Sequence, residues 1–299
     1  MNAIHHTPEA FAPSNGLRLC YDTFGDAAAP PMLLIMGLGA QMVLWDDEFC
    51  AALAARGYYV IRFDNRDIGR SSYFEEVAKI DLPALMMAQM QGKPITSPYT
   101  LRDMADDAAG LLDHLGIAAA HVAGASMGGM IAQEMAMNHA SRVRSLVSIM
   151  SSTGSPALPP PAPEAAAVLM APPPSGREEY IANFCRSWKV LRADSFPVDE
   201  ARDPARAARM WERGLNPAGV ARQLLAIFAG GDRTARLAGV TAPTLVIHGT
   251  PDPLVRIEAG RATAAAIPGA RLLEIGNMGH AIPLAIWDEV TDAMAGHCH

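Results

Sequence analysis

Basic residues, cysteine and long apolar runs are all scarce in this chain. Its 299 residues include 24 Lys and Arg against 31 Asp and Glu, the net charge is -7, and no basic run stands out. We therefore expect no nucleic-acid partner, because the basic surface that binds phosphates is missing. Apolar stretches such as residues 32–40 are too short, and too interrupted by glycine, to cross a bilayer, so we expect no membrane span.

The four cysteines are scattered and form no Cys-x-x-Cys pair. This pattern is typical of reduced, mostly buried thiols and not of a disulfide framework. The first 16 residues contain no Lys or Arg and no continuous apolar segment, so we expect no secretory signal and a cytoplasmic location. No group of His, Asp and Glu residues has the spacing of metal ligands, so we expect no metal and no other cofactor.

What the chain does have is a regular alternation of short apolar runs and helical segments. The apolar runs predict buried strands, and segments with helical spacing separate them. The expected strands cover residues 17–24, 32–36, 58–63, 120–123, 143–150, 244–248 and 271–275, and the clearest helices cover 47–56, 101–115 and 257–266. Repeated units of this kind predict an α/β fold with a mainly parallel sheet flanked by helices.

The alternation breaks after about residue 150. Prolines crowd residues 156–174, which excludes a sheet interior or one long helix there, and helical spacing follows. We therefore predict an α/β core of residues 1–150 and 236–299, with residues 151–235 inserted as a helical cap.

Two apolar side chains are candidates for the wall of a substrate pocket. Trp188 lies in the expected cap, where aromatic residues recur every four positions, and Met87 lies in a methionine-rich insertion at residues 81–98. Methionine at helical spacing more often fills gaps in a core, so core packing is the alternative for Met87.

The most informative motif is Gly124-Ala125-Ser126-Met127-Gly128, which fits Gly-x-Ser-x-Gly. It lies between an apolar strand and a helix, a setting in which a serine is held in a strained turn with its hydroxyl above the sheet. The flanking glycines avoid clashes there, and the helix directs its first backbone N–H groups toward the serine. Because the bare motif also occurs in ordinary turns, the interpretation depends on its partners.

Asp252 and His280 are the partners that such a serine requires, and each lies just past the end of an expected strand. Parallel strands bring their carboxyl ends to one edge of a sheet, so the two side chains can lie near the serine. The order nucleophile, acid, histidine along the chain is also the order found in proteins with this type of serine turn. We therefore predict Ser126 as nucleophile, His280 as base and Asp252 as the acid that orients the base. Asp232 and Asp288 are competing acids in less suitable positions.

An acyl-transfer site also needs donors for the oxyanion. The Met127 N–H, at the start of the helix, is one candidate, and the Leu38 N–H, in the glycine-rich loop of residues 37–40, is the second. A glycine-rich loop after a strand also suits a phosphate, but no Gly-x-Gly-x-x-Gly and no P-loop lysine complete that motif.

Together these segments resemble the α/β-hydrolase superfamily, and within it they look closest to carboxylesterases similar to aclacinomycin methylesterase. The resemblance rests on residues 36–39, the Asp64-x-Arg66-x-x-Gly69-x-Ser71 turn, residues 124–129, Asp252 and Gly279-His280. It implies the α/β-hydrolase fold, the triad named above, and Leu38 and Met127 as oxyanion donors. Met36 departs from many members of the family, in which a histidine commonly precedes the glycine of this loop.

We therefore expect a serine carboxylic-ester hydrolase that works through an acyl-enzyme on a small to medium, largely apolar ester. A lactonase, a thioesterase, a C–C bond hydrolase or a perhydrolase would use the same triad. A ligand receptor built on the same fold is the alternative of a different class. The natural ester and the oligomeric state stay open.

Overall fold

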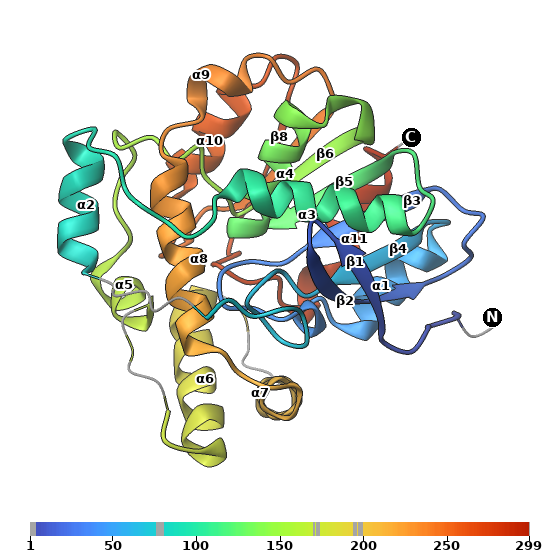
Figure 1. The fold of residues 1–299 in the computed structure, drawn as a ribbon, viewed down its shortest axis with the longest axis horizontal. Helices are drawn as coiled ribbons and strands as arrows, with labels where there is room; N and C mark the ends of the chain where they lie inside the picture. The colour runs from blue at the N-terminus through green and yellow to red at the C-terminus, as the bar shows by residue number, and fades with distance from the viewer. Residues whose placement is uncertain are drawn as a thin grey trace.

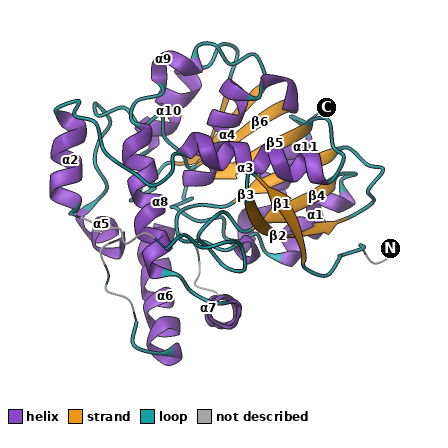
Figure 2. Cartoon of the chain, in the orientation of Figure 1, coloured by secondary structure: helices purple, strands orange, loops and turns teal. Residues whose placement is uncertain are grey.

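Within the described residues, eight strands form one central sheet in the computed structural model of the chain (Figures 1 and 2). The structure describes residues 4–75, 81–169, 171, 174–193, 196 and 200–298. The strands are β1 (Ala10–Ser14), β2 (Leu17–Phe24), β3 (Pro31–Ile35), β4 (Tyr59–Phe63), β5 (Ala120–Ala125), β6 (Val143–Ile149), β7 (Thr244–Gly249) and β8 (Arg271–Ile275). They lie in the order β1-β2-β4-β3-β5-β6-β7-β8.

The sheet is mainly parallel, as the sequence predicts. The pairs β1–β2 and β2–β4 are antiparallel, and all pairs from β4 to β8 are parallel. Every residue of β5 and β7 is buried, which explains why these strands are apolar on both faces. Because the parallel strands point the same way, the loops after β3, β5, β7 and β8 meet at one edge.

Helices cover both faces of the sheet. One apolar cluster packs α1 (Asp47–Ala55) and α11 (Trp287–Ala295) against the strands. A second cluster, on the opposite face, includes α3 (Leu101–His114) and α4 (Met127–Asn138), and α9 (Thr234–Leu237) and α10 (Ile257–Ala266) extend this layer. In Figure 1, α3 and α4 lie in front of the sheet.

Local signals placed several element boundaries well. Helix α3 begins at Thr100, whose hydroxyl accepts the Asp103 N–H at 3.2 Å while the Asp103 carboxylate accepts the Thr100 N–H at 2.7 Å. The helix is followed by Gly116, which has a φ of 69°. The pattern does not predict β1, which contains Pro13 and lies at the edge of the sheet, where proline is tolerated.

In the described part of the segment between β6 and β7, four helices precede α9: α5 (Pro163–Leu169), α6 (Arg177–Arg192), α7 (Arg202–Arg213) and α8 (Pro217–Gly230). They lie to one side of the sheet in Figures 1 and 2, with α2 (Leu82–Met90) beside them. Pro172 and Pro173 of the proline-rich stretch lie outside the described residues. The division into a core and a cap of residues 151–235 stays a prediction.

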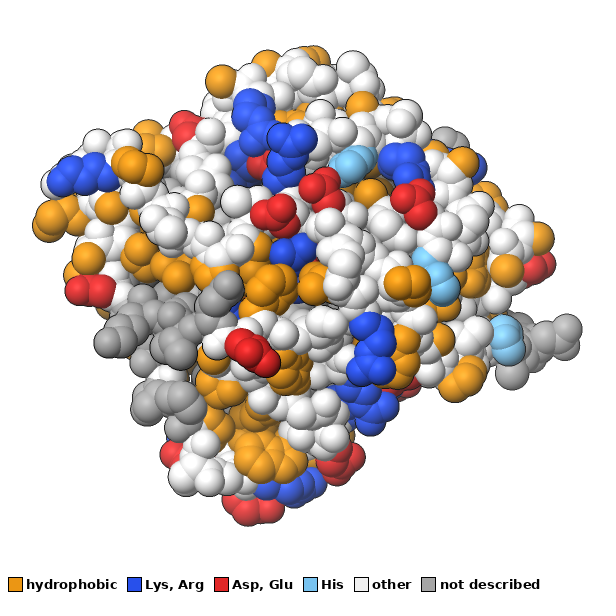
Figure 3. Space-filling model, in the orientation of Figure 1, with side chains coloured by type: hydrophobic (Ala, Val, Ile, Leu, Met, Phe, Trp, Pro, Cys, Tyr) orange, Lys and Arg blue, Asp and Glu red, His pale blue; other side chains and the backbone are white. Residues whose placement is uncertain are grey.

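The outer surface carries charges of both signs. Figure 3 shows Lys and Arg side chains next to Asp and Glu side chains, and hydrophobic side chains exposed where α6 lies in Figure 1. Across the described part of the chain, no helix combines the length and the apolar character that crossing a membrane requires.

Candidate active site

Ser126 occupies a sharp turn between β5 and α4. Its backbone φ is 56° and its ψ is -121°, a strained conformation for a residue with a side chain. The glycines of the motif are needed for close packing. A Cβ added at Gly124 would lie 2.0 Å from the carbonyl oxygen of Gly128, and one at Gly128 would lie 2.1 Å from that of Ile35. Glycine at position 124 therefore allows the turn to close onto the start of α4, and glycine at position 128 allows α4 to pack against β3.

The structure brings Ser126, His280 and Asp252 into one hydrogen-bonded chain. Nε2 of His280 lies 2.9 Å from Oγ of Ser126, and Nδ1 lies 2.8 Å from Oδ2 of Asp252. Asp252 is 1% exposed and His280 is 7% exposed. Because an ionised carboxylate only accepts hydrogen bonds, Nδ1 carries the imidazole proton. The Nε2 lone pair then accepts the serine hydroxyl, which is the orientation a general base needs.

The carboxylate of Asp252 is held by its own loop. Its Oδ1 accepts the backbone N–H groups of Leu254 and Val255, each at 2.9 Å, which leaves Oδ2 for the histidine. The fully buried His248 of β7 donates from Nε2 to the Val255 carbonyl at 2.7 Å and lies 3.6 Å from Oδ2 of Asp252. Burial lowers the pKa of His248, which favours its neutral form. The position of His248 within the apolar run of β7 is typical of a buried residue, but no motif indicates its contact with Asp252.

The loop that carries His280 rests on the end of α6. The His280 N–H donates to the Leu191 carbonyl at 2.6 Å, and a Cβ added at Gly279 would lie 2.3 Å from the Arg192 carbonyl oxygen. Arg192 is itself paired with Asp203, at 2.7 Å. The position of His280 thus depends on α6, a helix of the expected cap, as well as on the sheet. No sequence motif predicts the contact between α6 and the His280 loop.

The two competing acids do not contact His280. Oδ1 of Asp232 accepts the Thr234 N–H at 2.8 Å. The Asp288 side chain is 95% exposed and lies 3.5 Å from Arg56. Among these carboxylates, Asp252 alone is hydrogen-bonded to the histidine.

The expected oxyanion donors lie in segments that adjoin Ser126. Met127 is the first residue of α4. The backbone of Gly37 lies close to Ser126, because a Cβ added there would lie 3.1 Å from the Ser126 Cβ and 3.6 Å from its Oγ. Within the described residues, the N–H groups of Leu38 and Met127 donate no hydrogen bond, so both remain available to a ligand.

Comparison with known proteins identifies the family to which this chain belongs. A sequence model described as the alpha/beta hydrolase fold matches residues 30–284. The chain belongs to the α/β-hydrolase fold family. The expected fold class is confirmed, and the strained serine turn at the end of β5 is characteristic of this family.

Several relatives of this chain are named as esterases, lactonases or other hydrolases. Rhodomycin D methylesterase DauP of Streptomyces sp. (strain C5) is 30% identical over 97% of this chain and 98% of that protein. A 2-hydroxy-6-oxononadienedioate/2-hydroxy-6-oxononatrienedioate hydrolase of Cupriavidus pinatubonensis is 34% identical over 87% of this chain and 83% of that protein. The crystal structure of an enol-lactonase from Burkholderia xenovorans LB400 has a TM-score of 0.71 at 27% identity, covering 96% of this chain and 99% of that one. The resemblance to methylesterases is confirmed, and the relatives support hydrolase activity.

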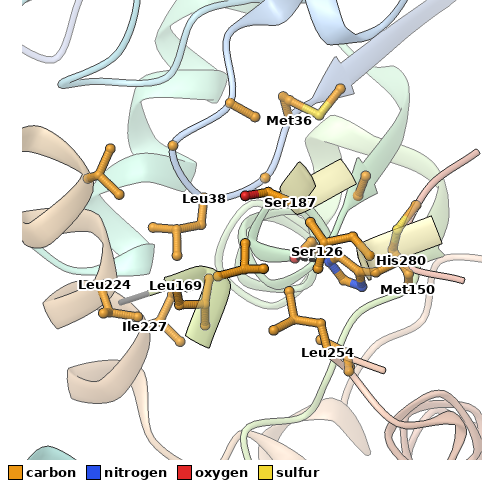
Figure 4. A pocket seen from close by; sticks show the side chains of 18 of the residues that line it. Met36, Leu38, Ser126, Met150, Leu169, Ser187, Leu224, Ile227, Leu254 and His280 are labelled. Carbon is orange, nitrogen blue, oxygen red and sulfur yellow. Dashed lines mark hydrogen bonds between the residues drawn. The ribbon is translucent and has the colours of Figure 1, made fainter. Parts of the chain in front are cut away.

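In this α/β-hydrolase, Ser126 and His280 face a cavity of about 1130 Å³. Figure 4 shows apolar side chains from several elements around these two residues, among them Met150, Leu169, Leu224, Ile227 and Leu254. Pockets for drug-sized ligands typically measure roughly 300–1,000 Å³. The cavity therefore has room for a ligand larger than a small ester.

Of the two expected pocket residues, Trp188 lines the cavity and Met87 does not. The Met87 side chain is 61% exposed, and Met86 and Met90 of the same helix line the cavity instead. Residues four apart share a helix face, whereas the next residue is turned by about 100°. The expectation for Met87 is thus corrected to Met86 and Met90.

Buried ion pairs fix α7 and α8 on the turn that follows β4. Arg213 pairs with Asp64, and Arg222 forms two hydrogen bonds of 2.8 Å with Asp67. Both carboxylates are fully buried. Removing one partner of such a pair leaves an uncompensated buried charge, which typically costs about 3–5 kcal/mol. The charged turn of the sequence motif is therefore an anchor for the helices above the site.

Proposed function

We propose that this protein is a serine carboxylic-ester hydrolase. The observation that carries the proposal is the chain of hydrogen bonds from Ser126 to His280 at 2.9 Å and from His280 to Asp252 at 2.8 Å. In this arrangement an imidazole takes the serine proton as the oxygen attacks a carbonyl carbon.

The proposed reaction has two halves. Ser126 Oγ attacks the ester carbonyl while His280 accepts its proton, and Asp252 stabilises the resulting imidazolium. The N–H groups of Leu38 and Met127 bind the oxyanion. The imidazolium then protonates the departing alcohol, which leaves the acyl group on Ser126. Water, deprotonated by His280, releases the acid. No step needs a cofactor.

The proposed substrate is a largely uncharged ester with a bulky apolar part. The apolar walls and the volume of about 1130 Å³ support this substrate class and extend the small to medium range expected from the sequence. We propose that residues 151–235 act as the cap over the cavity, to which α5, α6 and α8 contribute lining residues.

A cytoplasmic location is part of the proposal, since Cys20, Cys50, Cys185 and Cys298 are all free thiols.

A C–C bond hydrolase is the second candidate. The relative from Cupriavidus pinatubonensis, at 34% identity, is named as a hydrolase of 2-hydroxy-6-oxononadienedioate and 2-hydroxy-6-oxononatrienedioate. Its name supports this alternative. The same triad would catalyse this reaction, but the enzyme would break a bond between two carbon atoms instead of the bond between a carbon and an ester oxygen.

Trapping the intermediate tests the proposal. Rapid mixing with p-nitrophenyl esters of increasing acyl length, followed by acid quenching and digestion, should yield the Ser126 peptide heavier by one acyl group. Ser126→Ala, treated in the same way, is the control and should carry no adduct. An acyl group on another residue would contradict the nucleophile assignment. Cleavage of a vinylogous diketone with no turnover of any oxygen ester would support the second candidate.

A further inference from the structure

The loop that carries Leu38 is attached at both ends to the turn after β4. We call residues 36–42 the oxyanion loop. At its start, the Asn65 side-chain amide donates to the Met36 carbonyl at 2.8 Å. At its end, the Met42 N–H donates to Oδ1 of Asp64 at 2.8 Å. Asp64 and Asn65 are both buried, so these two bonds are shielded from water.

The middle of the oxyanion loop is held from above by α8. Oε1 of Gln223 accepts the Gly39 N–H at 3.0 Å, and its Nε2 donates to the Arg66 carbonyl at 2.8 Å. Gln223 is fully buried, and both ends of its amide are hydrogen-bonded. Val220, one turn earlier on α8, packs on the same glycine, since a Cβ added at Gly39 would lie 3.2 Å from Cγ2 of Val220.

These contacts fix the direction of the Leu38 N–H. The Gly37 carbonyl accepts the Ala40 N–H at 3.3 Å, which orients the peptide plane between Gly37 and Leu38. In a trans peptide the C=O and N–H point in opposite directions, so the Leu38 N–H points away from this turn. The next N–H, that of Gly39, is occupied by Gln223. Within the described residues the Leu38 N–H has no acceptor of its own, and this orientation leaves it for the oxyanion.

We propose that Gln223 is a positioning residue that holds the oxyanion loop in its donating conformation. The inference rests on the proposed serine-hydrolase function. Without the amide, the Gly39 N–H and the Arg66 carbonyl lose their partners, and the loop is free to shift between its two anchored ends. A displacement of about 1 Å at a catalytic donor lowers rates substantially, because the donor must meet the charge that develops in the transition state.

Gln223→Leu is the decisive variant, and Gln133→Leu is its matched control. Gln133 lies in α4, is also fully buried, and makes two side-chain hydrogen bonds, with Ser148 and Arg233, each at 3.3 Å. We expect Gln223→Leu to lower kcat about 10- to 100-fold with KM within about threefold. We expect Gln133→Leu to change kcat less than about threefold, at a similar loss of Tm.

An inhibitor separates positioning from general destabilisation. Phenylboronic acid forms a tetrahedral adduct with an active-site serine, and one of its oxygens takes the place of the oxyanion. Its inhibition constant should rise in Gln223→Leu by about the factor that kcat falls. Gln223→Glu keeps an acceptor for the Gly39 N–H and should retain more of kcat than Gln223→Leu. Equal losses in Gln223→Leu and Gln133→Leu, or a change confined to KM, would overturn the proposal.

Amide hydrogen exchange tests the same role without any substrate. In Gln223→Leu, the peptide that contains residues 37–41 should exchange at least about tenfold faster than in the wild type, and in Gln133→Leu it should not. If no ester is turned over and no adduct forms on Ser126, the proposed function fails, yet faster exchange in this peptide still supports the role of Gln223. Unchanged exchange would overturn that role whatever the activity.

Discussion

Replacing Asp252 by asparagine should reverse the hydrogen bonding of His280 without disturbing the fold. Oδ1 of Asp252 accepts two backbone N–H groups, from Leu254 and Val255, each at 2.9 Å. In the Asp252→Asn variant the amide oxygen must stay on that side, because turning the amide would set its N–H groups against two donors. The side-chain NH₂ therefore takes the position of Oδ2, 2.8 Å from Nδ1 of His280.

The magnitude follows from this fixed orientation. Turning the amide would leave two buried N–H groups without acceptors, at about 1–3 kcal/mol each. Facing an NH₂ donor, Nδ1 must accept, so the imidazole proton moves to Nε2 and points at Ser126. A base in this tautomer cannot take the serine proton. We expect kcat to fall about 10³- to 10⁴-fold, which corresponds to roughly 4–5.5 kcal/mol in the activation barrier.

Steady-state hydrolysis of a p-nitrophenyl ester measures the effect, with Tm as the control for folding. Asp288→Asn is the matched control, because its 95% exposed side chain lies 3.5 Å from Arg56 and does not contact His280. We expect that variant to keep kcat within about twofold. A loss of less than tenfold in Asp252→Asn, with Tm unchanged, would refute the assignment of Asp252 as the orienting acid.

Three further predictions concern the nucleophile, a buried histidine and the pocket. Ser126→Ala should reduce ester turnover below about one part in a thousand while circular dichroism and Tm stay nearly unchanged; greater residual turnover would exclude Ser126 as nucleophile. Burial lowers the pKa of His248 from its ordinary value of 6.5, so the unfolded chain binds the extra proton first as the pH falls. The free energy of unfolding should then decrease below about pH 6.5, by up to about 1.4 kcal/mol per pH unit from this group, and denaturant titrations of His248→Gln should show a shallower decrease. Trp188→Ala should change the preferred acyl length more than the rate on the smallest ester, whereas Met87→Ala, at a 61% exposed position outside the cavity, should change neither.

Most of the fold could be predicted from sequence patterns that involve only a few neighbouring residues. The apolar run of β5 and the glycines around Ser126 predict a strand, a sharp turn and a helix, because each requirement is local. Glycine is needed at position 128 because the backbone there lies against β3, which is distant in the sequence, yet the local motif already includes this glycine. The edge strand β1 was not predicted, since five residues that include Pro13 have no clear periodicity.

The orientation of a helix about its axis is harder to predict from the sequence. In α2, nine residues without a single charge offer no polar face by which to orient the helix. Met86, Met87 and Met90 are therefore equivalent in the sequence, and only the folded chain distinguishes the two that line the cavity. Trp188 belongs to a helix with charged residues at both ends and an aromatic series along one side, so its position was predictable.

The contacts that position the proposed catalytic groups are the least predictable from the sequence, because most of them involve the backbone. Gln223 and Gly39 are 184 residues apart, and the hydrogen bond between them uses an N–H that almost every residue has. The same holds for His280, whose N–H donates to the Leu191 carbonyl. Such contacts depend on where two backbones meet. If residues 151–235, the proposed cap, are replaced by the matching segment of a relative, that segment must supply both a side-chain amide at position 223 and a helix end at position 191. Substrate range and rate should therefore change together when this proposed cap is exchanged, even though it contains none of Ser126, Asp252 and His280.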